Sequence, residues 1–215
     1  MKIGVFDSGV DGLSVAQAVK KALPKHEVLF RFDADHFPYS NRAPEEILGF
    51  VIPILELLTK DGCEIIVIAC NTVSTTLIDQ LRALIAVPLI AIEPMIKPAA
   101  ERTKSRAILV CATPTTLASA RYADLKNEYA RDIVVYEPDC SEWSSMIEHD
   151  AVDETFIATS LQEGLANGAD VIVLGCTHYH WIETLIATIA VDKAIVLQPE
   201  SAIINRLTQV IKEIR

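Results

Sequence analysis

The amino-acid sequence predicts an α/β protein built from two similar halves, each around a parallel sheet. Short apolar runs alternate with amphipathic stretches along the whole chain. Several runs are nearly continuous in Val and Ile, which is typical of parallel strands buried on both faces. The segment "DGCEIIVIACNT" at 61–72 also resembles "NGADVIVLGCTH" at 167–178. Strand–helix alternation together with an internal repeat indicates two α/β domains.

Each predicted element has a reason in its residues. The strands are short runs rich in Val, Ile and Phe: Lys2–Asp7, Glu27–Phe32, Glu64–Ala69, Leu89–Ile92, Arg106–Cys111, Asp132–Tyr136, Asp170–Gly175 and Ala194–Leu197. The helices are longer amphipathic stretches: Ser14–Leu23, Pro44–Lys60, Ser74–Ile85, Thr115–Ala130, Glu154–Asn167 and Glu200–Ile214. Pro24 follows the first helix, Pro44 opens the second, Pro88 follows the third and Gly168 follows the fifth. These positions fit, because Pro is favoured in a first helical turn but cannot continue a helix, and Gly tolerates the left-handed cap.

The repeat extends beyond the two quoted segments. Cys176 stands 106 positions after Cys70, and the same offset places other strand ends on one another. The corresponding pairs are Ile3–Asp7 with Leu109–Thr113, Val28–Phe30 with Val134–Tyr136, Asp33 with Asp139 and, nearly, Leu89–Ile92 with Ile195–Gln198. We therefore expect an N-terminal domain over 1–96 and a second domain over 97–199, with the boundary near Met95–Pro98. The last helix, within 200–215, could pack on either half.

Composition and charge exclude several classes of function. Hydrophobic residues make up 51% of the 215-residue chain, so a sizeable core can be buried. A net charge of −10 disfavours nucleic acid and anionic membrane surfaces as partners. The apolar runs are shorter than the ~20 residues that a membrane span needs, and the N-terminus reads as a strand rather than a signal peptide. The five cysteines show no paired or metal-binding spacing. We expect a cytoplasmic protein.

Two thiols stand where parallel sheets bind ligands. Cys70 and Cys176 each follow the third strand of a half and precede a helix, and ligands lie beyond the carboxyl ends of such strands. A helix start favours the thiolate, which lowers the thiol pKa. If a pseudo-two-fold axis relates the halves, the active site lies between them and a ligand has one thiol on each side. Two opposed acid/base groups suit the inversion of a stereocentre.

Other polar residues at strand ends are candidates for the same site. Asp7 and Ser8 follow the first strand, where Gly9 and Gly12 permit close backbone approach. The hydroxyls of Tyr39 and Ser40 could donate hydrogen bonds to a substrate carboxylate. His178 lies two residues after Cys176, where a histidine can assist proton transfer. The residues expected to cap the helices and to bind substrate are Asn71, Thr72 and Thr177.

The motifs together resemble the glutamate racemase family of the aspartate/glutamate racemase superfamily. The similar segments are "GVFDSGVDGLSV" at 4–15, "FPYSNRAPEEI" at 37–47, "DGCEIIVIACNT" at 61–72, "VPLIAIEPMIKPAA" at 87–100, "ATPTTLAS" at 112–119 and "LGCTHYH" at 174–180. They follow the family's order over nearly the whole chain. The family usually has Gly at the positions of Asp11 and Ser40.

The resemblance implies an activity and roles for residues. It implies interconversion of L- and D-glutamate without pyridoxal phosphate, metal or other cofactor, and D-glutamate feeds peptidoglycan synthesis, and so the bacterial cell wall. The C-terminal helix would return to the first domain. Cys70 and Cys176 match the two catalytic thiols, assisted by Asp7 and His178. Two more residues take roles from the resemblance alone: Thr116 as a substrate contact and Glu148 as a catalytic acid.

Three alternatives stay open at this stage. One is a racemase for aspartate or another amino acid, which Ser40 keeps open. Another is a relative that needs only one thiol, such as a decarboxylase, which the presence of both thiols disfavours. The third is a non-catalytic acidic binding protein. The expected partner is the small molecule glutamate, with no nucleic acid and no membrane, and a homodimer is among the assemblies left open.

Overall fold

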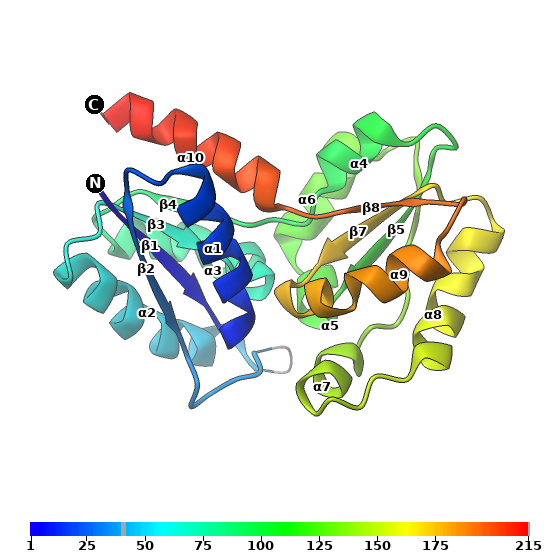
Figure 1. Cartoon of the computed structure of the whole chain (residues 1–215), viewed down its shortest axis with the longest axis horizontal. Coiled ribbons are helices and arrows are strands. Elements are labelled where there is room, and N and C mark those ends of the chain that lie inside the picture. The colour runs from blue at the N-terminus through cyan, green and yellow to red at the C-terminus, as the bar shows by residue number, and fades with distance from the viewer. Residues whose placement is uncertain (40–41, 215) are drawn as a thin grey trace. The chain divides into compact units, whose positions relative to one another are not determined.

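The computed structural model describes residues 1–39 and 42–214 and confirms the α/β class (Figure 1). It contains two four-stranded sheets, in the orders β2-β1-β3-β4 and β6-β5-β7-β8, and all the strand pairs are parallel. Counted from the first strand of each sheet, both orders read 2-1-3-4. The two halves of the chain therefore repeat the same topology, as the sequence repeat predicts.

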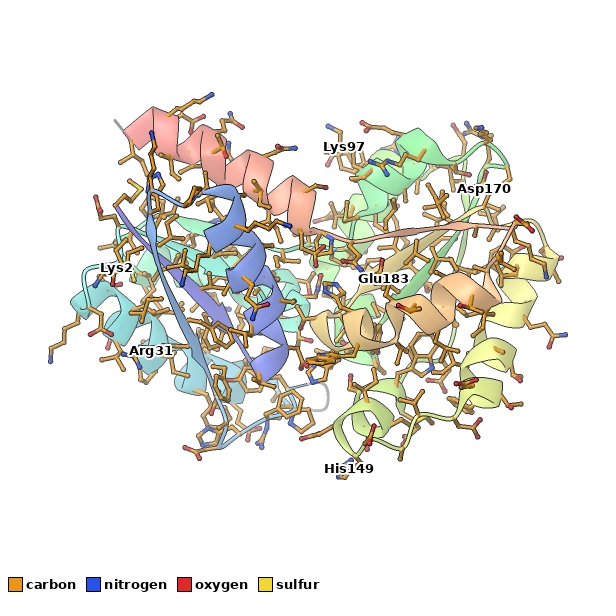
Figure 2. All side chains as sticks on the ribbon, in the orientation of Figure 1. Lys2, Arg31, Lys97, His149, Asp170 and Glu183 are labelled. Carbon is orange, nitrogen blue, oxygen red and sulfur yellow. The ribbon has the colours of Figure 1, made fainter. Side chains whose placement is uncertain are left out.

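The eight predicted strands are all present, within one or two residues of the expected ends. Their bounds are β1 Lys2–Asp7, β2 Glu27–Phe32, β3 Ile65–Ile68, β4 Leu89–Ala91, β5 Ala107–Ala112, β6 Val134–Tyr136, β7 Val171–Gly175 and β8 Ile195–Leu197. Strands β1, β3, β5 and β7 are the central ones, and the last three are buried along their whole length. Lys2 and Asp170, labelled in Figure 2, mark the amino-terminal edges of the two sheets.

Five of the six predicted helices are present, and the structure adds several shorter ones. The bounds are α1 Leu13–Ala22, α2 Pro44–Lys60, α3 Asn71–Leu84, α4 Ile96–Arg102, α5 Pro114–Leu117, α6 Ala120–Tyr129, α7 Trp143–Glu148, α8 Glu154–Ala166, α9 Glu183–Ile189 and α10 Glu200–Ile214, with 3₁₀ turns η1 Val10–Gly12 and η2 Thr177–Ile182. The single helix predicted over Thr115–Ala130 is wrong, because α5 and α6 replace it. Ser119 separates them and caps α6, since its Oγ accepts a hydrogen bond from Tyr122 N at 3.2 Å.

The chain divides into two compact units, 1–93 with 199–215 and 94–198. The sequence prediction divides the domains after residues 96 and 199. In unit 1, α1 and α10 cover one face of the sheet, and α2 and α3 cover the other. In unit 2, α4 and α6 cover one face, and α7, α8 and α9 cover the other. Each sheet is thus buried on both faces, which explains its continuous apolar strands.

The helix that follows each fourth strand belongs to the other unit. Helix α4 follows β4 of unit 1 but packs on β5 and β7 through Ile96 and Ala99. Helix α10 follows β8 of unit 2 but packs on unit 1 through Ile203, Leu207 and neighbouring apolar residues. Each unit is therefore completed by a helix from the opposite side of the division. Within the described residues, no helix is long and apolar enough to cross a bilayer.

Candidate active site

A first group of predicted residues surrounds Cys70 at the carboxyl end of the unit 1 sheet. Cys70 occupies the N-cap position of α3, two residues after the end of β3. Ser8 directly follows β1, and its Oγ lies 3.3 Å from the Cys70 Sγ. Strands β1 and β3 are paired neighbours, so their ends bring the two buried side chains together. We call Asp7, Ser8, Tyr39, Cys70 and Asn71 the Cys70 site.

Asp7 is held rigidly within this site. It is the last residue of β1, fully buried, and its Oδ1 accepts hydrogen bonds from Ser8 N at 2.7 Å and Ser8 Oγ at 3.4 Å. Gly12 approaches it so closely that an added Cβ would lie 2.8 Å from Asp7 Oδ2. The predicted close backbone approach at Gly12 is thus confirmed, and it fixes the carboxylate from one side.

The prediction that Asn71, Thr72 and Thr177 cap the following helices is wrong. Cys70 and Cys176 are themselves the N-cap residues, without a side-chain cap hydrogen bond, and Asn71 and Thr177 are the first residues inside. Asn71 is 4% exposed, and among the described residues neither its Nδ2 nor its Oδ1 has a hydrogen-bond partner. A buried amide left in this state costs free energy. The Asn71 amide is therefore available to a ligand at the start of α3.

Tyr39 lies in the Cys70 site, but its hydroxyl is engaged. Its Oη donates to Asp33 Oδ2 at 2.6 Å, whereas the sequence prediction has this hydroxyl donating to a substrate carboxylate. Burial raises the pKa of Tyr39 well above its usual value, and the hydrogen bond to Asp33 and the charges of Asp33, Cys70 and Asp7 raise it further. The phenol therefore lies within electrostatic range of both Cys70 and Asp7.

Asp33 is a residue of this region to which the sequence analysis gave no role. It directly follows β2, at the same end of the sheet as Asp7, and its side chain is buried. The sequence feature that could have identified Asp33 is its position directly after a strand. The sequence repeat also aligns Asp33 with Asp139. Burial raises the pKa of Asp33, but hydrogen bonds from Tyr39 and His36 outweigh burial and hold it below its usual value.

A second group surrounds Cys176 in unit 2. Cys176 directly follows β7, and η2 begins at the next residue. His178 Nδ1 lies 3.8 Å from Cys176 Sγ, within hydrogen-bond reach of a sulfur atom, and both side chains are nearly buried. Thr177 between them is also buried. We call Cys176, Thr177 and His178 the Cys176 site.

Thr116 lies at the carboxyl end of the same sheet. Its hydroxyl accepts a hydrogen bond from Thr113 Oγ1 at 3.0 Å, and its backbone N donates to that oxygen at 3.3 Å. Thr113, directly after β5, is the N-cap of the short helix α5. Both threonines are buried, and β5 pairs with β7, the strand that ends at Cys176.

Two other predicted site residues cannot be placed beside either thiol. Glu148 is exposed at the end of α7, a helix whose Trp143 packs edge-on against Tyr179 of η2. Ser40 lies outside the described residues. Among the residues that the structure describes, no cluster of three or more His, Cys, Asp or Glu side chains could hold a metal ion.

Two further thiols share the apolar core under the Cys176 site. Cys111 and Cys140 are buried in one cluster with Cys176, Trp143 and Tyr179. Burial raises the pKa of Cys140 far above its usual value, and a hydrogen bond with the Cys111 thiol adds to this. Cys140 is therefore held as a neutral thiol. In unit 1, Cys63 is also buried, and burial raises its pKa.

Comparison with known proteins assigns the chain to a family. The profile of the Asp/Glu/Hydantoin racemase family matches residues 13–205. The chain belongs to this family. Glutamate racemase of Ralstonia pickettii (strain 12J) is 37% identical over 209 residues, covering 95% of this chain and 74% of its own. Glutamate racemase of Roseiflexus sp. (strain RS-1) is 35% identical over 216 residues, covering 98% of this chain and 79% of its own.

Solved structures of racemases from this family share the fold. The Escherichia coli glutamate racemase, in complex with L-glutamate and the activator UDP-MurNAc-Ala, superposes with a TM-score of 0.88 at 25% identity. The match covers 98% of this chain and 82% of that one. The Francisella tularensis enzyme in complex with D-glutamate gives a TM-score of 0.81 at 28% identity, covering 99% and 81%.

Proposed function

We propose that this protein interconverts L- and D-glutamate by removing the Cα proton on one side and returning a proton on the other. The observation that carries the proposal is the matched pair of thiols. Each of the two sheets presents a nearly buried cysteine at the carboxyl end of its third strand, at a helix or 3₁₀ start, next to a polar partner. Relatives named glutamate racemase, two of them solved with L- or D-glutamate bound, support the choice of substrate.

In this proposal, Cys70 and Cys176 are the two acid/base groups. In one direction a thiolate removes the Cα proton while the other thiol delivers a proton to the opposite face, and in the reverse direction they exchange roles. A thiol has an ordinary pKa near 8.5 and can act in both states. The Cα proton of an amino acid is far less acidic. Exclusion of water and stabilisation of the developing carbanion must therefore reduce the difference between the pKa of the Cα proton and that of the thiol.

The residues next to each thiol support the assignment of Cys70 and Cys176 as the two acid/base groups. In the Cys70 site, Asp7 and Ser8 form a buried acid–hydroxyl pair, and the Ser8 hydroxyl lies 3.3 Å from the sulfur atom. In the Cys176 site, His178 can relay a proton to or from the sulfur atom. Thr116 contributes a substrate contact at the end of β5. Glu148 stands as a further catalytic acid in the proposal on the family resemblance alone, because its side chain is exposed and no described contact ties it to Cys176.

Substrate binding is proposed for the polar residues at the helix starts. The buried Asn71 amide, which has no partner within the described part of the chain, offers two donors and an acceptor. Thr72 and Thr177 lie in the first turns beside the thiols. A helix N-terminus favours a carboxylate through its N–H groups and dipole. A protein of net charge −10 can therefore still bind a substrate with two carboxylates. In the cell, we place this activity in the cytoplasm, as a supply of D-glutamate for peptidoglycan.

Isotope exchange tests the reaction and the substrate together. Purified protein is incubated in D₂O with L-glutamate, and in parallel with L-aspartate. We expect deuterium at Cα together with D-glutamate, and at least about a hundredfold less exchange with aspartate, since a site shaped for one chain length loses binding to another. Exchange of aspartate at an equal rate would reassign the substrate, and the absence of exchange from both would contradict a racemase.

Single cysteine variants test the two-thiol assignment. We expect Cys70→Ala and Cys176→Ala each to lower racemisation at least about a thousandfold, because general acid/base groups contribute roughly 10²–10⁴-fold. Cys63→Ala is the matched control, since this buried thiol lies outside both sites and should leave racemisation within about threefold of wild type. Circular dichroism checks that each variant is folded. Retained racemisation in either site variant would rule out the two-thiol reaction.

A further inference from the structure

Tyr179 ties the η2 turn to the segment that precedes α7. It follows His178 within η2 and is fully buried, and its Oη donates to the backbone carbonyl of Cys140 at 3.0 Å. The same carbonyl accepts from Trp143 N at 3.2 Å, at the start of α7. The Tyr179 ring also packs edge-on against the Trp143 ring, with centroids 5.1 Å apart. One side chain of η2 therefore makes both a polar and an apolar contact with the start of α7.

The phenol of Tyr179 is held from a second side as well. The Ser144 side chain, in the first turn of α7, hydrogen-bonds to it. Because the phenol donates its one O–H to the Cys140 carbonyl, it accepts from Ser144. Burial raises the pKa of Tyr179 well above its usual value, so the phenol keeps the proton that it donates. This hydroxyl thus acts as both donor and acceptor within the core.

The segment that contacts Tyr179 is itself fixed to the sheet. The Cys140 thiol hydrogen-bonds with the Cys111 thiol of β5, and both lie in the cluster that contains Trp143 and Tyr179. On the other side, Tyr179 N donates at 3.2 Å to the carbonyl of Cys176, the residue that directly follows β7. Strands β5 and β7 are paired neighbours. The Tyr179 hydroxyl therefore links two segments that start from adjacent strands.

The position of η2 decides whether His178 lies beside Cys176. The His178 Nδ1 is 3.8 Å from the Cys176 Sγ, a long distance for a hydrogen bond to sulfur, so a small displacement of η2 would separate the two groups. A 3₁₀ turn has poorer backbone hydrogen bonds than an α-helix, and its position therefore depends more on the packing of its side chains. The buried side chain of Tyr179 supplies such packing one residue after His178.

We infer that Tyr179 is a positioning residue: through its hydrogen bond to the Cys140 carbonyl it holds η2 so that His178 stays beside Cys176. The inference rests on the proposed function for its effect on racemisation, in which proton transfer at Cys176, and not at Cys70, should depend on the Tyr179 hydroxyl. Its effect on the accessibility of the Cys176 thiol does not depend on the substrate.

Tyr179→Phe tests the inference, because it removes the hydroxyl and keeps the ring. We expect kcat for racemisation to fall about tenfold with KM changed less than about threefold, since a misplacement of about 1 Å can cost on the order of a hundredfold. Tyr122→Phe is the matched control. Tyr122 is also fully buried in unit 2 and donates to Glu137 at 2.8 Å, but it packs on the opposite face of the sheet from Cys176. This variant should keep kcat within about threefold of wild type.

Substrate deuterium isotope effects separate positioning from a loss of folded protein. They are measured with Cα-deuterated L-glutamate and D-glutamate, one for each direction. Slower proton transfer at Cys176 should raise the isotope effect in the direction in which Cys176 removes the Cα hydrogen and lower it in the other, so we expect the ratio of the two to shift at least about 1.5-fold in Tyr179→Phe. A smaller folded fraction lowers both rates equally and leaves this ratio unchanged. An unchanged ratio, or wild-type kcat, in folded Tyr179→Phe overturns the inference.

The second measurement is alkylation by iodoacetamide without substrate, with mass spectrometry reporting Cys176 and Cys70 in the same sample. Because Cys176 is only 9% exposed, loosening of η2 should expose its thiol. We expect the alkylation rate of Cys176 relative to Cys70 to rise about threefold or more in Tyr179→Phe and to stay unchanged in Tyr122→Phe. An unchanged relative rate in Tyr179→Phe overturns the inference. If wild-type protein does not racemise glutamate, the proposed function fails and the relative alkylation rate alone decides the inference. If Tyr179→Phe does not fold, Ser144→Ala, which removes the second partner of the phenol, takes its place under the same criteria.

Discussion

At the scale of single residues, the Cys70 site depends on the absence of a side chain at Gly12. The backbone of this residue has ordinary helical angles, so glycine is not needed there for its conformational freedom. It is needed because the Asp7 side chain fills the space that a Cβ would occupy, with Asp7 Oδ2 at 2.8 Å and Asp7 Cβ closer still. Overpacking of a buried contact costs about 1–3 kcal/mol or forces the neighbour to move. Because the position of the Asp7 Cβ is set by the backbone, rotation of the side chain cannot relieve this contact, and the end of β1 or the η1 turn must shift.

Gly12→Ala should therefore impair both catalysis and stability. We expect racemisation to fall at least about tenfold, because the Asp7 carboxylate is displaced from Ser8, while the free energy of unfolding falls by about 1–3 kcal/mol. Gly49→Ala is the control: Gly49 lies inside α2 with nothing within 4 Å of an added Cβ, and alanine favours a helix interior. Wild-type turnover in Gly12→Ala would show that the position of Asp7 is not critical.

At the scale of elements, one carboxylate closes the turn between α4 and β5 at the amino-terminal edge of the unit 2 sheet. Asp170 Oδ1 accepts from Thr103 Oγ1 at 2.5 Å, and its Oδ2 accepts from the backbone N of Lys104 at 2.7 Å and of Ser105 at 2.9 Å. Burial raises the pKa of Asp170, but these hydrogen bonds outweigh it and the pKa lies below its usual value. The turn before β5 is thus tied to the start of β7 by an ionised side chain (Figure 2).

Replacing this carboxylate should cost stability in a pH-dependent way. Asp170→Asn places an NH₂ group against N–H donors, and we expect a loss of about 1–3 kcal/mol at pH 7. Because the folded pKa lies below the unfolded value near 3.9, the contribution is complete above pH 4–5 and disappears as pH falls through the folded pKa. Urea unfolding followed by the fluorescence of Trp143 and Trp181, both in unit 2, measures the difference. Asp132→Asn, at an exposed ion pair, should cost less than about 1 kcal/mol, and a pH-independent difference for Asp170→Asn would contradict the charge-based account.

Strands and long helices could be predicted from the sequence, whereas helix starts and short helices could not. Continuous Val and Ile runs indicated the central strands, because burial on both faces leaves no room for polar residues. The edge strands are partly exposed, and shorter apolar runs indicated them. The caps were misassigned because Asn71 is a good N-cap by propensity, yet the short distance from the end of β3 puts Cys70 at that position. Helices α7 and α9 have too few turns to show a clear apolar period.

At the scale of the whole molecule, the repeat in the sequence accounts for both the fold and the candidate site. The offset between Cys70 and Cys176 placed both thiols at the ends of equivalent strands, and the topology 2-1-3-4 in each unit follows from the same repeat. The Asp33–Tyr39 hydrogen bond could not be predicted, because it depends on how the chain turns after β2. The packing of α10 on unit 1 was expected from the family resemblance alone, since its apolar stripe suits either sheet; contacts with β1, β3 and α1 decide it.

Because α10 follows unit 2 in the sequence but packs on unit 1, the stability of unit 1 depends on both ends of the chain. Leu207 is fully buried in the cluster that joins α10 to the unit 1 sheet, so Leu207→Ala should lower the free energy of unfolding by about 2–5 kcal/mol. Because α10 covers β1 and β3, the strands that lead to Ser8 and Cys70, the loss should appear as faster hydrogen exchange in these strands, measured by mass spectrometry. Arg206→Ala on the same helix removes only a long, exposed ion pair and should cost less than about 1 kcal/mol. Exchange in β1 that is unchanged by Leu207→Ala would mean that the unit 1 sheet is stable without α10, and that the helix adds no support to the Cys70 site.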